Sequence, residues 1–346
     1  MKKVGILTIF NEYNFGNRLQ NYAVQEILKK QGLEVETIKY IGLNDRKPYT
    51  DTKQAIERLE KFKEFNQNIK FADEILYVEH ETPQKLSDSY DYIVIGSDQI
   101  WNFTFDKIFC DKIFGAFVPK DKRISLSASF GVNYVPKEET EIYKICKKYL
   151  QEMKAISVRE HAGVNIVKAL TERDDVELLI DPTMMLDKAD WEKIMKRPKD
   201  LTKDKFILKS FLGNTHDGCY EQLQRIAEEQ GCDIIDISNP NSPFYNVGPA
   251  EFLYLEKNAY LIATDSFHSC VFGMLFSTPF IVIERDDEEE SMHSRIETLL
   301  GKFQLHNRIY NGRIDMEKLQ EDNQHIFPIL EEERKKVVQF LDKTLL

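Results

Sequence analysis

The chain has 346 residues, of which 42% are hydrophobic and 30% charged, and its 47 Lys and Arg against 58 Asp and Glu give a net charge of −11. At roughly 100–200 residues per domain, this length predicts two domains, and the apolar fraction suffices for a core in each. The composition excludes a disordered chain, a collagen and a small disulfide scaffold. No dense basic block with interleaved aromatics is present, so we expect no nucleic-acid partner.

The apolar runs and the cysteines bear on the compartment. Residues 4–10 form a seven-residue apolar run after Met-Lys-Lys, but no cleavage site follows, so we interpret it as a buried strand and not as a signal peptide. No run reaches the 18 or more apolar residues that a spanning helix needs. The five cysteines are scattered without a CxxC pair, which predicts free thiols in a reducing cytoplasm.

Short apolar runs that alternate with helical patterns predict a parallel α/β fold. Residues 4–10, 92–95 and 280–283 are continuously hydrophobic, as expected of strands that are buried on both faces. Residues 18–31 place their apolar side chains on one helical face, and Gly32 ends that helix. Weaker strand candidates are residues 35–40, 123–128, 155–158, 178–180, 206–211, 233–237 and 261–264.

The alternation runs twice, and we therefore predict two Rossmann-like domains, residues 1–176 and 177–330, followed by a C-terminal amphipathic helix, residues 331–346. Residues 44–90 are rich in charged side chains, with apolar residues at helical spacing from 55 to 76, and are interpreted as a surface helical insertion. The predicted fold is α/β, with two Rossmann-like domains facing across a cleft. Ligands of such folds bind at the carboxyl ends of the strands.

The loop after the first predicted strand runs straight into a helix with the sequence NEYNFGNRLQN. A strand, a turn and a helix N-terminus present free backbone N–H groups to an anion or a sugar, so Asn17 is a candidate ligand contact. The alternative is that its Gly and Asn residues only serve the geometry of the turn.

The loop after residues 92–95 reads GSDQIWN. Ser97, Asp98 and Gln99 supply hydrogen-bonding groups and a base, and Trp101 offers a flat face for a sugar ring. In the alternative interpretation, Ser97 or Asp98 caps a helix and Trp101 is a core aromatic.

Two further motifs, ISVRE and TDSFHS, place an arginine and a histidine after predicted strands. Arg159 follows a short strand in ISVRE, where its fork could bind a carboxylate or phosphate or form a structural salt bridge with Glu160 or another acid. In TDSFHS, Ser266 lies among residues that cap a helix, and His268 lies in the first turn, where the helix dipole favours anions, although a lone His is often structural. Arg295 opens another helix and is a weaker candidate. The histidines lack metal-ligand spacing, so no metal site is predicted.

In this order the motifs resemble the polysaccharide pyruvyl transferase family. The matching stretches are FGNRLQNYA, IGSDQIWN, SVRE, DPTM and TDSFHS, which together extend over about residues 4 to 300. The resemblance implies a GT-B-like fold and transfer of a pyruvyl unit from phosphoenolpyruvate to a saccharide or lipid-linked saccharide during surface polysaccharide synthesis. It implies no cofactor besides phosphoenolpyruvate as co-substrate, no membrane span, and at most peripheral membrane contact through a lipid-linked acceptor.

The resemblance also assigns roles. It places the donor near Arg159 and His268, with His268 as the acid and with Ser266 and Arg295 on the donor side. Asn17, Ser97, Asp98, Gln99 and Trp101 then form the acceptor surface in the N-terminal domain.

The chain departs from the family pattern at two places. Relatives often read GNxGD in the first loop, where this chain has GNRLQ, and TDRLHG in the last motif, where Ser266 stands in place of Arg. Arg18, Arg285 or Arg295 are candidate substitutes for that cation. Two alternatives therefore stay open: a nucleotide-sugar glycosyltransferase of GT-B type, and a non-catalytic saccharide-binding homologue.

Overall fold

The structure is a computed structural model that describes the chain except residues 43–51, 106–108, 214–216, 286–292, 322 and 346. It divides into two compact units. Unit 1 comprises Met1–Lys47, Asn66–Met185 and Glu331–Leu346, and unit 2 comprises Pro48–Phe65 and Leu186–Leu330. The chain thus changes units after Met185, whereas we predicted a boundary at 176, and the C-terminal helix belongs largely to unit 1.

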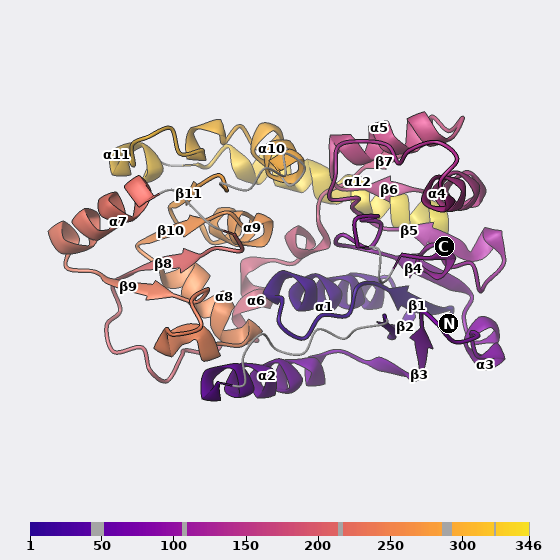
Figure 1. Cartoon of the computed structure of the whole chain (residues 1–346), viewed down its shortest axis with the longest axis horizontal. Helices are drawn as coiled ribbons and strands as arrows, with labels where there is room; N and C mark the ends of the chain where they lie inside the picture. Colours follow the sequence, from indigo (N-terminus) through magenta and orange to yellow (C-terminus); the bar gives the residue numbers. More distant parts are fainter. Residues whose placement is uncertain (43–51, 106–108, 214–216, 286–292, 322, 346) are drawn as a thin grey trace. The chain divides into compact units, whose positions relative to one another are not determined.

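Unit 1 is built on a parallel sheet with the strand order β3-β2-β1-β4-β5 (Figure 1). A parallel pair, β6 and β7, lies next to this sheet, because isolated bridges join Ile124 to Ala155 and Ala128 to Val158. The strands are β1 (Lys3–Leu7), β2 (Glu34–Ile41), β3 (Phe71–Tyr77), β4 (Tyr92–Ile95), β5 (Arg123–Ser125), β6 (Ser157–Val158) and β7 (Glu177–Leu178). The helices of the unit are α1 (Phe15–Lys30), α3 (Gln84–Asp88), α4 (Glu141–Glu152), α5 (His161–Leu170), the 3-10 helix η4 (Pro182–Met185) and most of α12 (Ile326–Leu345).

Unit 2 has a four-stranded parallel sheet with the order β11-β10-β8-β9. Every residue of its helix α9 is buried, which explains why that segment is apolar all round rather than striped. The strands are β8 (Phe206–Ser210), β9 (Asp233–Asp236), β10 (Leu261–Thr264) and β11 (Phe280–Val282). The helices are α2 (Lys53–Phe65), α6 (Lys188–Glu192), α7 (Asp217–Gln230), α8 (Pro249–Asn258), α9 (Phe267–Phe276), α10 (His293–Lys302) and α11 (Met316–Leu319).

Most predicted strands are present, and 92–95 and 261–264 have the predicted bounds. The predicted helical insertion is wrong for residues 71–77, which form β3 and pair in parallel with β2. Sheet pairing overrides the local pattern there, because burying Ala72 and Leu76 beside β2 favours the strand. Residues 44–51 of the predicted insertion lie outside the described residues.

The strand orders place a topological switch point in each sheet. The order reverses between β1 and β4 in unit 1 and between β8 and β10 in unit 2. In open α/β sheets, ligands bind outside the carboxyl ends of the strands at such points, because the loops on either side diverge there. The loops that follow these four strands are therefore the places to look for a site.

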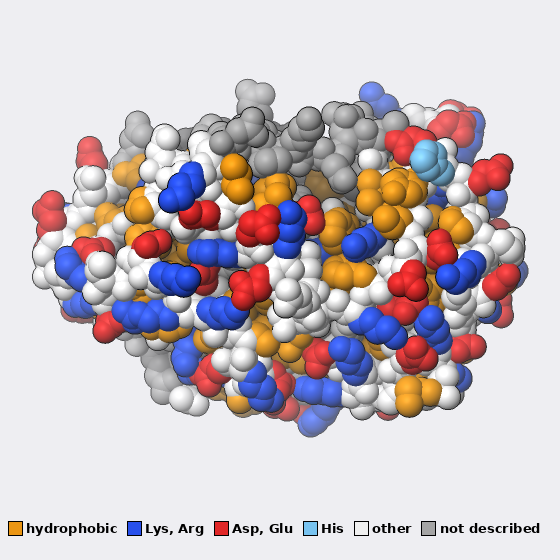
Figure 2. Space-filling model, turned by 90° about the horizontal axis from the view of Figure 1, so that it is seen from below, with side chains coloured by type: hydrophobic (Ala, Val, Ile, Leu, Met, Phe, Trp, Pro, Cys, Tyr) orange, Lys and Arg blue, Asp and Glu red, His pale blue; other side chains and the backbone are white. Residues whose placement is uncertain are grey.

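No helix among the described residues is both long and apolar enough to cross a membrane. Figure 2 shows Lys and Arg side chains interspersed with Asp and Glu over the face it presents. Some Lys side chains form exposed ion pairs one turn apart on a helix, such as Lys63 with Glu60, and such pairs contribute little to stability individually.

Gly96, directly after β4, has a backbone conformation that a side chain would not tolerate. Its φ is +119°, and a Cβ would collide with the carbonyl oxygen of Leu126. We expect Gly96→Ala to destabilise the protein by more than the about 1–3 kcal/mol that a disfavoured φ costs by itself. Urea unfolding measures the loss.

Gly32→Ala is the matched control, because Gly32 also has a positive φ, of +75°, but a Cβ there would meet nothing within 4 Å. Equal losses in the two variants would show that the close approach of residue 96 to Leu126 contributes nothing.

Candidate functional site

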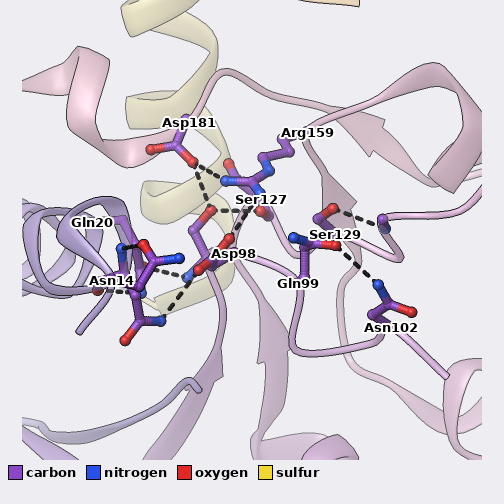
Figure 3. Close-up of polar contacts among 12 residues, drawn as sticks. Asn14, Gln20, Asp98, Gln99, Asn102, Ser127, Ser129, Arg159 and Asp181 are labelled. Atoms are coloured by element: carbon purple, nitrogen blue, oxygen red, sulfur yellow. Dashed lines mark hydrogen bonds and ion pairs between the residues drawn. The ribbon is translucent and has the colours of Figure 1, made fainter. Parts of the chain in front are cut away.

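Arg159, which directly follows β6, links the polar loops of unit 1 (Figure 3). Its Nη1 lies 2.6 Å from Oδ2 of Asp181, and its Nη2 lies 2.9 Å from Oδ1 of Asp98. The Arg159 side chain is 0% exposed. The sequence left open a ligand clamp or a salt bridge for this residue, and the structure shows the salt bridge, with Asp98 and Asp181 as its close acidic partners.

A third carboxylate completes the cluster around Arg159. Glu160 Oε2 lies 3.9 Å from Arg159 Nε, and Glu160 Oε1 accepts a hydrogen bond from the backbone N–H of Phe130. Burial by itself would lower the pKa of the Arg159 guanidinium, but the negative charges of Asp98, Asp181 and Glu160 outweigh it, and the pKa lies above its ordinary value. The cation is therefore firmly charged.

Asp98 connects this cluster to the start of α1. Its φ is +65°, an uncommon conformation for a residue with a side chain, and its Oδ2 accepts a hydrogen bond from Asn17 Nδ2 at 3.2 Å. Asn17 Oδ1 in turn accepts one from Arg18 Nη2 at 2.6 Å. Burial lowers the pKa of Arg18 to about 10, against the opposing charges of Glu12 and Asp98.

Every polar atom of Ser97 takes part in a hydrogen bond. Its Oγ lies 2.8 Å from the carbonyl oxygen of Ser127 and 3.0 Å from Asp181 Oδ2, its N–H donates to Gln20 Oε1, and its carbonyl accepts from Thr8 Oγ1. The Gly96–Ser97 peptide bond is cis. Ser97 and Asn17 are 0% and 1% exposed, so both position the loop rather than face solvent.

Gln99 and Trp101, from the same loop, have opposite environments. Gln99 is half-buried, and its Oε1 accepts a hydrogen bond from Asn102 Nδ2 at 2.9 Å (Figure 3). Trp101 is 0% exposed, stacks on Phe114 and donates its indole N–H to the carbonyl of Ile113. The core-aromatic alternative therefore describes Trp101, and we leave it out of the acceptor surface because no face of its ring meets solvent.

In unit 2, Asp265 connects the loops at the switch point. Its carboxylate accepts hydrogen bonds from the backbone N–H groups of Leu212 and Gly213, which follow β8, at 2.7 and 2.9 Å. It also forms a 2.6 Å ion pair with Nε of Arg285, which lies beyond β11. Arg285 is one of the candidate substitutes for the arginine that the family pattern has at position 266. It thus contacts the TDSFHS motif, in which that arginine is absent.

Ser266 and His268 lie at the N-terminus of the buried helix α9. Ser266 is the N-cap residue, but its side chain makes no capping hydrogen bond. His268, in the first turn, is 8% exposed and has its ring edge-on to Phe267, with centroids 5.3 Å apart. A helix N-terminus without a side-chain cap favours an anion, since the helix dipole and the first N–H groups point outward. Arg295 lies on α10 and is 7% exposed.

Below the first turn of α9 lies a buried acid that the sequence reasoning did not single out. Glu256, on α8, is 0% exposed, and its Oε1 lies 2.6 Å from Ser269 Oγ, which lies 3.0 Å from Ser210 Oγ at the end of β8. Burial raises the pKa of Glu256 well above its ordinary value, although the hydrogen bond with Ser269 opposes the shift. Burial thus favours the protonated form of Glu256, and its hydrogen bond with Ser269 links α8 to α9 and, through Ser210, to β8.

The structure brings the predicted residues together in two groups. In unit 1 it gathers Asn17, Ser97, Asp98 and Arg159 with Asp181 and Glu160, and in unit 2 it places Ser266 and His268 in one helical turn beside Asp265. Asp181 lies within the matching stretch DPTM, but we assigned it no role from the sequence. Its position, an acid directly after the predicted strand of residues 178–180 and three residues after the end of β7, is the signal that could have found it.

Comparison with known proteins agrees with this architecture. The family model for polysaccharide pyruvyl transferases matches residues 14–287. No curated protein matches the chain. Among solved structures, the UDP-GlcNAc 2-epimerase from Methanocaldococcus jannaschii is similar, with a TM-score of 0.53, 12% sequence identity and coverage of 99% of each chain. The Neisseria meningitidis enzyme bound to UDP-GlcNAc has a TM-score of 0.49 and 11% identity, with 100% of this chain and 99% of that chain covered. The predicted α/β fold with two Rossmann-like domains of the GT-B type is confirmed.

We expect Arg159→Ala to lower the free energy of unfolding by about 3–5 kcal/mol, because it leaves three buried carboxylates without their shared cation. Urea denaturation measures this loss. Arg225→Ala is the control, since Arg225 forms an exposed pair with Glu229. If Arg159→Ala unfolds like the wild-type protein, the cluster does not hold the loops together.

Glu256→Gln tests whether the buried acid is neutral. A raised folded-state pKa means that the native protein keeps a proton that the unfolded chain releases, so wild-type stability falls as pH rises above the unfolded pKa of about 4.3. Relative to the Gln variant, we expect a loss of about 1.4 kcal/mol per pH unit until the folded pKa is reached.

Urea unfolding of the wild-type protein and of Glu256→Gln between about pH 5 and about pH 8 measures this slope. Glu229→Gln, at an exposed position, is expected to track the wild-type protein at every pH. A constant difference between the wild-type and Glu256→Gln proteins would mean that Glu256 is ionised.

Proposed function

Because the chain belongs to the polysaccharide pyruvyl transferase family, we propose that it transfers a pyruvyl unit from phosphoenolpyruvate to a saccharide or lipid-linked saccharide in surface polysaccharide synthesis. The observation that carries the proposal is the family match over residues 14–287. The resemblance of the site motifs, and the clustering of these motifs at the switch point of each sheet, support it.

The proposed reaction needs an acid, an anion site and a surface for a diol. The acid protonates the methylene carbon of phosphoenolpyruvate, and one acceptor hydroxyl attacks the resulting oxocarbenium-like carbon and loses its proton. The C–O bond to phosphate breaks, phosphate departs, and the neighbouring hydroxyl closes the cyclic ketal with loss of a second proton. General acid catalysis and preorganised dipoles lower the barrier of such steps.

On the donor side, we assign the acid to His268. Its position in the first turn of α9 places it beside a helix N-terminus that favours the donor phosphate. The Ser266 hydroxyl, which makes no capping hydrogen bond, is available to the same phosphate. Arg285 and Arg295 are the cations of unit 2 that we associate with the donor. Arg159 takes part only if one of its two closest carboxylate partners, Asp98 or Asp181, turns away, because its side chain is 0% exposed.

On the acceptor side, we assign direct contact to Gln99, the half-buried residue of its loop. The buried Asn17, Ser97 and Asp98 then have a positioning role, since they hold that loop on α1 and on Arg159. We place the reaction in the cytoplasm, in keeping with five unpaired cysteines, and expect only peripheral membrane contact through a lipid-linked acceptor.

Thermal-shift measurements with phosphoenolpyruvate and with UDP distinguish this proposal from a nucleotide-sugar glycosyltransferase, because a bound ligand stabilises the native state by RT ln(1 + [L]/Kd). We expect phosphoenolpyruvate to raise the melting temperature and UDP to leave it unchanged. The reverse result would favour the glycosyltransferase, and no response to phosphoenolpyruvate would favour a non-catalytic saccharide-binding protein.

His268→Ala is expected to lower phosphate release from phosphoenolpyruvate by about 10²–10⁴-fold while leaving the melting temperature nearly unchanged, since the ring donates a proton but lies at the edge of the core. A coupled phosphate assay with a panel of saccharides measures the rate. His306→Ala, an exposed histidine of the same unit, is the control. A large loss of stability in His268→Ala, with residual turnover intact, would make His268 a structural residue.

A further inference from the structure

We infer that Tyr134 is the aromatic platform on which the acceptor saccharide packs, with the side-chain amide of Gln99 as its hydrogen-bonding neighbour. The inference rests on the proposed function for the existence of a saccharide acceptor. It replaces Trp101, whose ring is buried, with a residue that the sequence analysis did not single out.

A chain of aromatic contacts leads from the buried Trp101 to the surface at Tyr134. Trp101 stacks on Phe114 at 5.5 Å, and Phe114 contacts Phe109 at 6.0 Å. Phe109 contacts Phe103 edge-on at 6.5 Å, and Phe103 contacts Tyr134 edge-on at 5.4 Å between ring centroids. Phe103 is 6% exposed and Tyr134 51%, so the tyrosine ring contacts the core through Phe103 while half of the residue's surface remains open. A ring held in this way loses little freedom when a ligand binds.

The loop that carries Tyr134 is joined to the Gln99 loop. Trp101 donates its backbone N–H to the carbonyl of Ser129, and Gly131 donates its own to Ser129 Oγ. Gly131 has a φ of +67°, and a Cβ there would collide with the side-chain amide of Gln99, so the backbone passes directly over this amide. Tyr134 and Gln99 therefore belong to one local structure at the carboxyl edge of the unit 1 sheet.

The side-chain amide of Gln99 can donate a hydrogen bond to a ligand. Asn102 Nδ2 donates to Gln99 Oε1, which fixes the orientation of the Gln99 side chain (Figure 3). Within the described part of the chain, Gln99 Nε2 donates no hydrogen bond, and it is not buried. A pyranose presents an apolar C–H face and a rim of hydroxyls, so a half-open aromatic ring and an amide donor on two joined loops match both of its surfaces.

Exposure by itself would not single out Tyr134, because isolated apolar side chains are common on protein surfaces. Phe327 is another half-exposed aromatic, at 40%, but it lies in the first turn of α12 and not at the carboxyl edge of a sheet. Tyr134 differs because its half-open ring contacts the core through Phe103 and because its loop, which follows a strand of the parallel sheet, is joined to the loop of Gln99.

Saturation-transfer NMR with methyl β-D-galactopyranoside and methyl β-D-glucopyranoside tests the inference without the donor. We expect the wild-type protein to saturate the ring C–H protons of at least one glycoside. Tyr134→Ala is expected to weaken its Kd at least about tenfold, equivalent to about 1.4 kcal/mol, while Tyr134→Phe retains binding because it keeps the ring. Gln99→Ala is expected to weaken binding as well, through the lost donor.

Phe327→Ala is the matched control, since it removes a half-exposed aromatic from unit 2, and circular dichroism melting checks that each variant is folded. Glycoside binding that is absent in the wild-type protein, or unchanged in Tyr134→Ala, would overturn the inference. Binding that depends on Tyr134 in a protein that releases no phosphate from phosphoenolpyruvate would support the acceptor platform and refute the donor chemistry, so the two failures are distinguishable.

Discussion

The buried cluster of Arg159 with three carboxylates is the constraint on which the first unit depends. Asp98 follows β4, Arg159 and Glu160 follow β6, and Asp181 follows β7, so the cluster ties together the carboxyl ends of three strands. Desolvating these charges is costly, and an apolar cluster of similar volume would serve stability at least as well. Its retention at a switch point is therefore better explained by the need to fix loop geometry than by stability.

The second unit fixes its loops with different chemistry. Asp265 is satisfied mainly by backbone N–H groups and by Arg285, whereas Glu256 has a pKa raised by burial and forms its hydrogen bond with a serine on α9. Asp265 and Arg285 form an ion pair beside the N-terminus of α9, whereas three carboxylates surround one guanidinium in the Arg159 cluster. The two units therefore hold their loops with different balances of charge.

The sequence predicted the parts that depend on local order. Continuous apolar runs located the parallel strands, and polar residues at their ends located the loops at both switch points. It failed where a distant partner decides the outcome: β3 needs the edge of β2, and the partners of Arg159 lie 61 and 22 residues away. The burial of Trp101 could not be predicted from the sequence either. The GSDQIWN sequence suits an exposed platform as well as a core aromatic, and only the contacts with Phe114 and Phe130 decide between them.

The acidic net charge gives the substitution at Ser266 a physical context. A chain with a charge of −11 attracts an anionic donor only where local dipoles or cations exceed the overall field. At α9 the helix N-terminus supplies one such dipole, and Arg285 lies within reach of the same motif through its 2.6 Å contact with Asp265. An arginine at position 266 would add a second positive charge near Arg285, whereas Ser266 adds no charge at the N-terminus of α9. Under the proposed function, the cation that relatives carry on this helix is supplied here from the loop beyond β11, and Asp265 holds it in place.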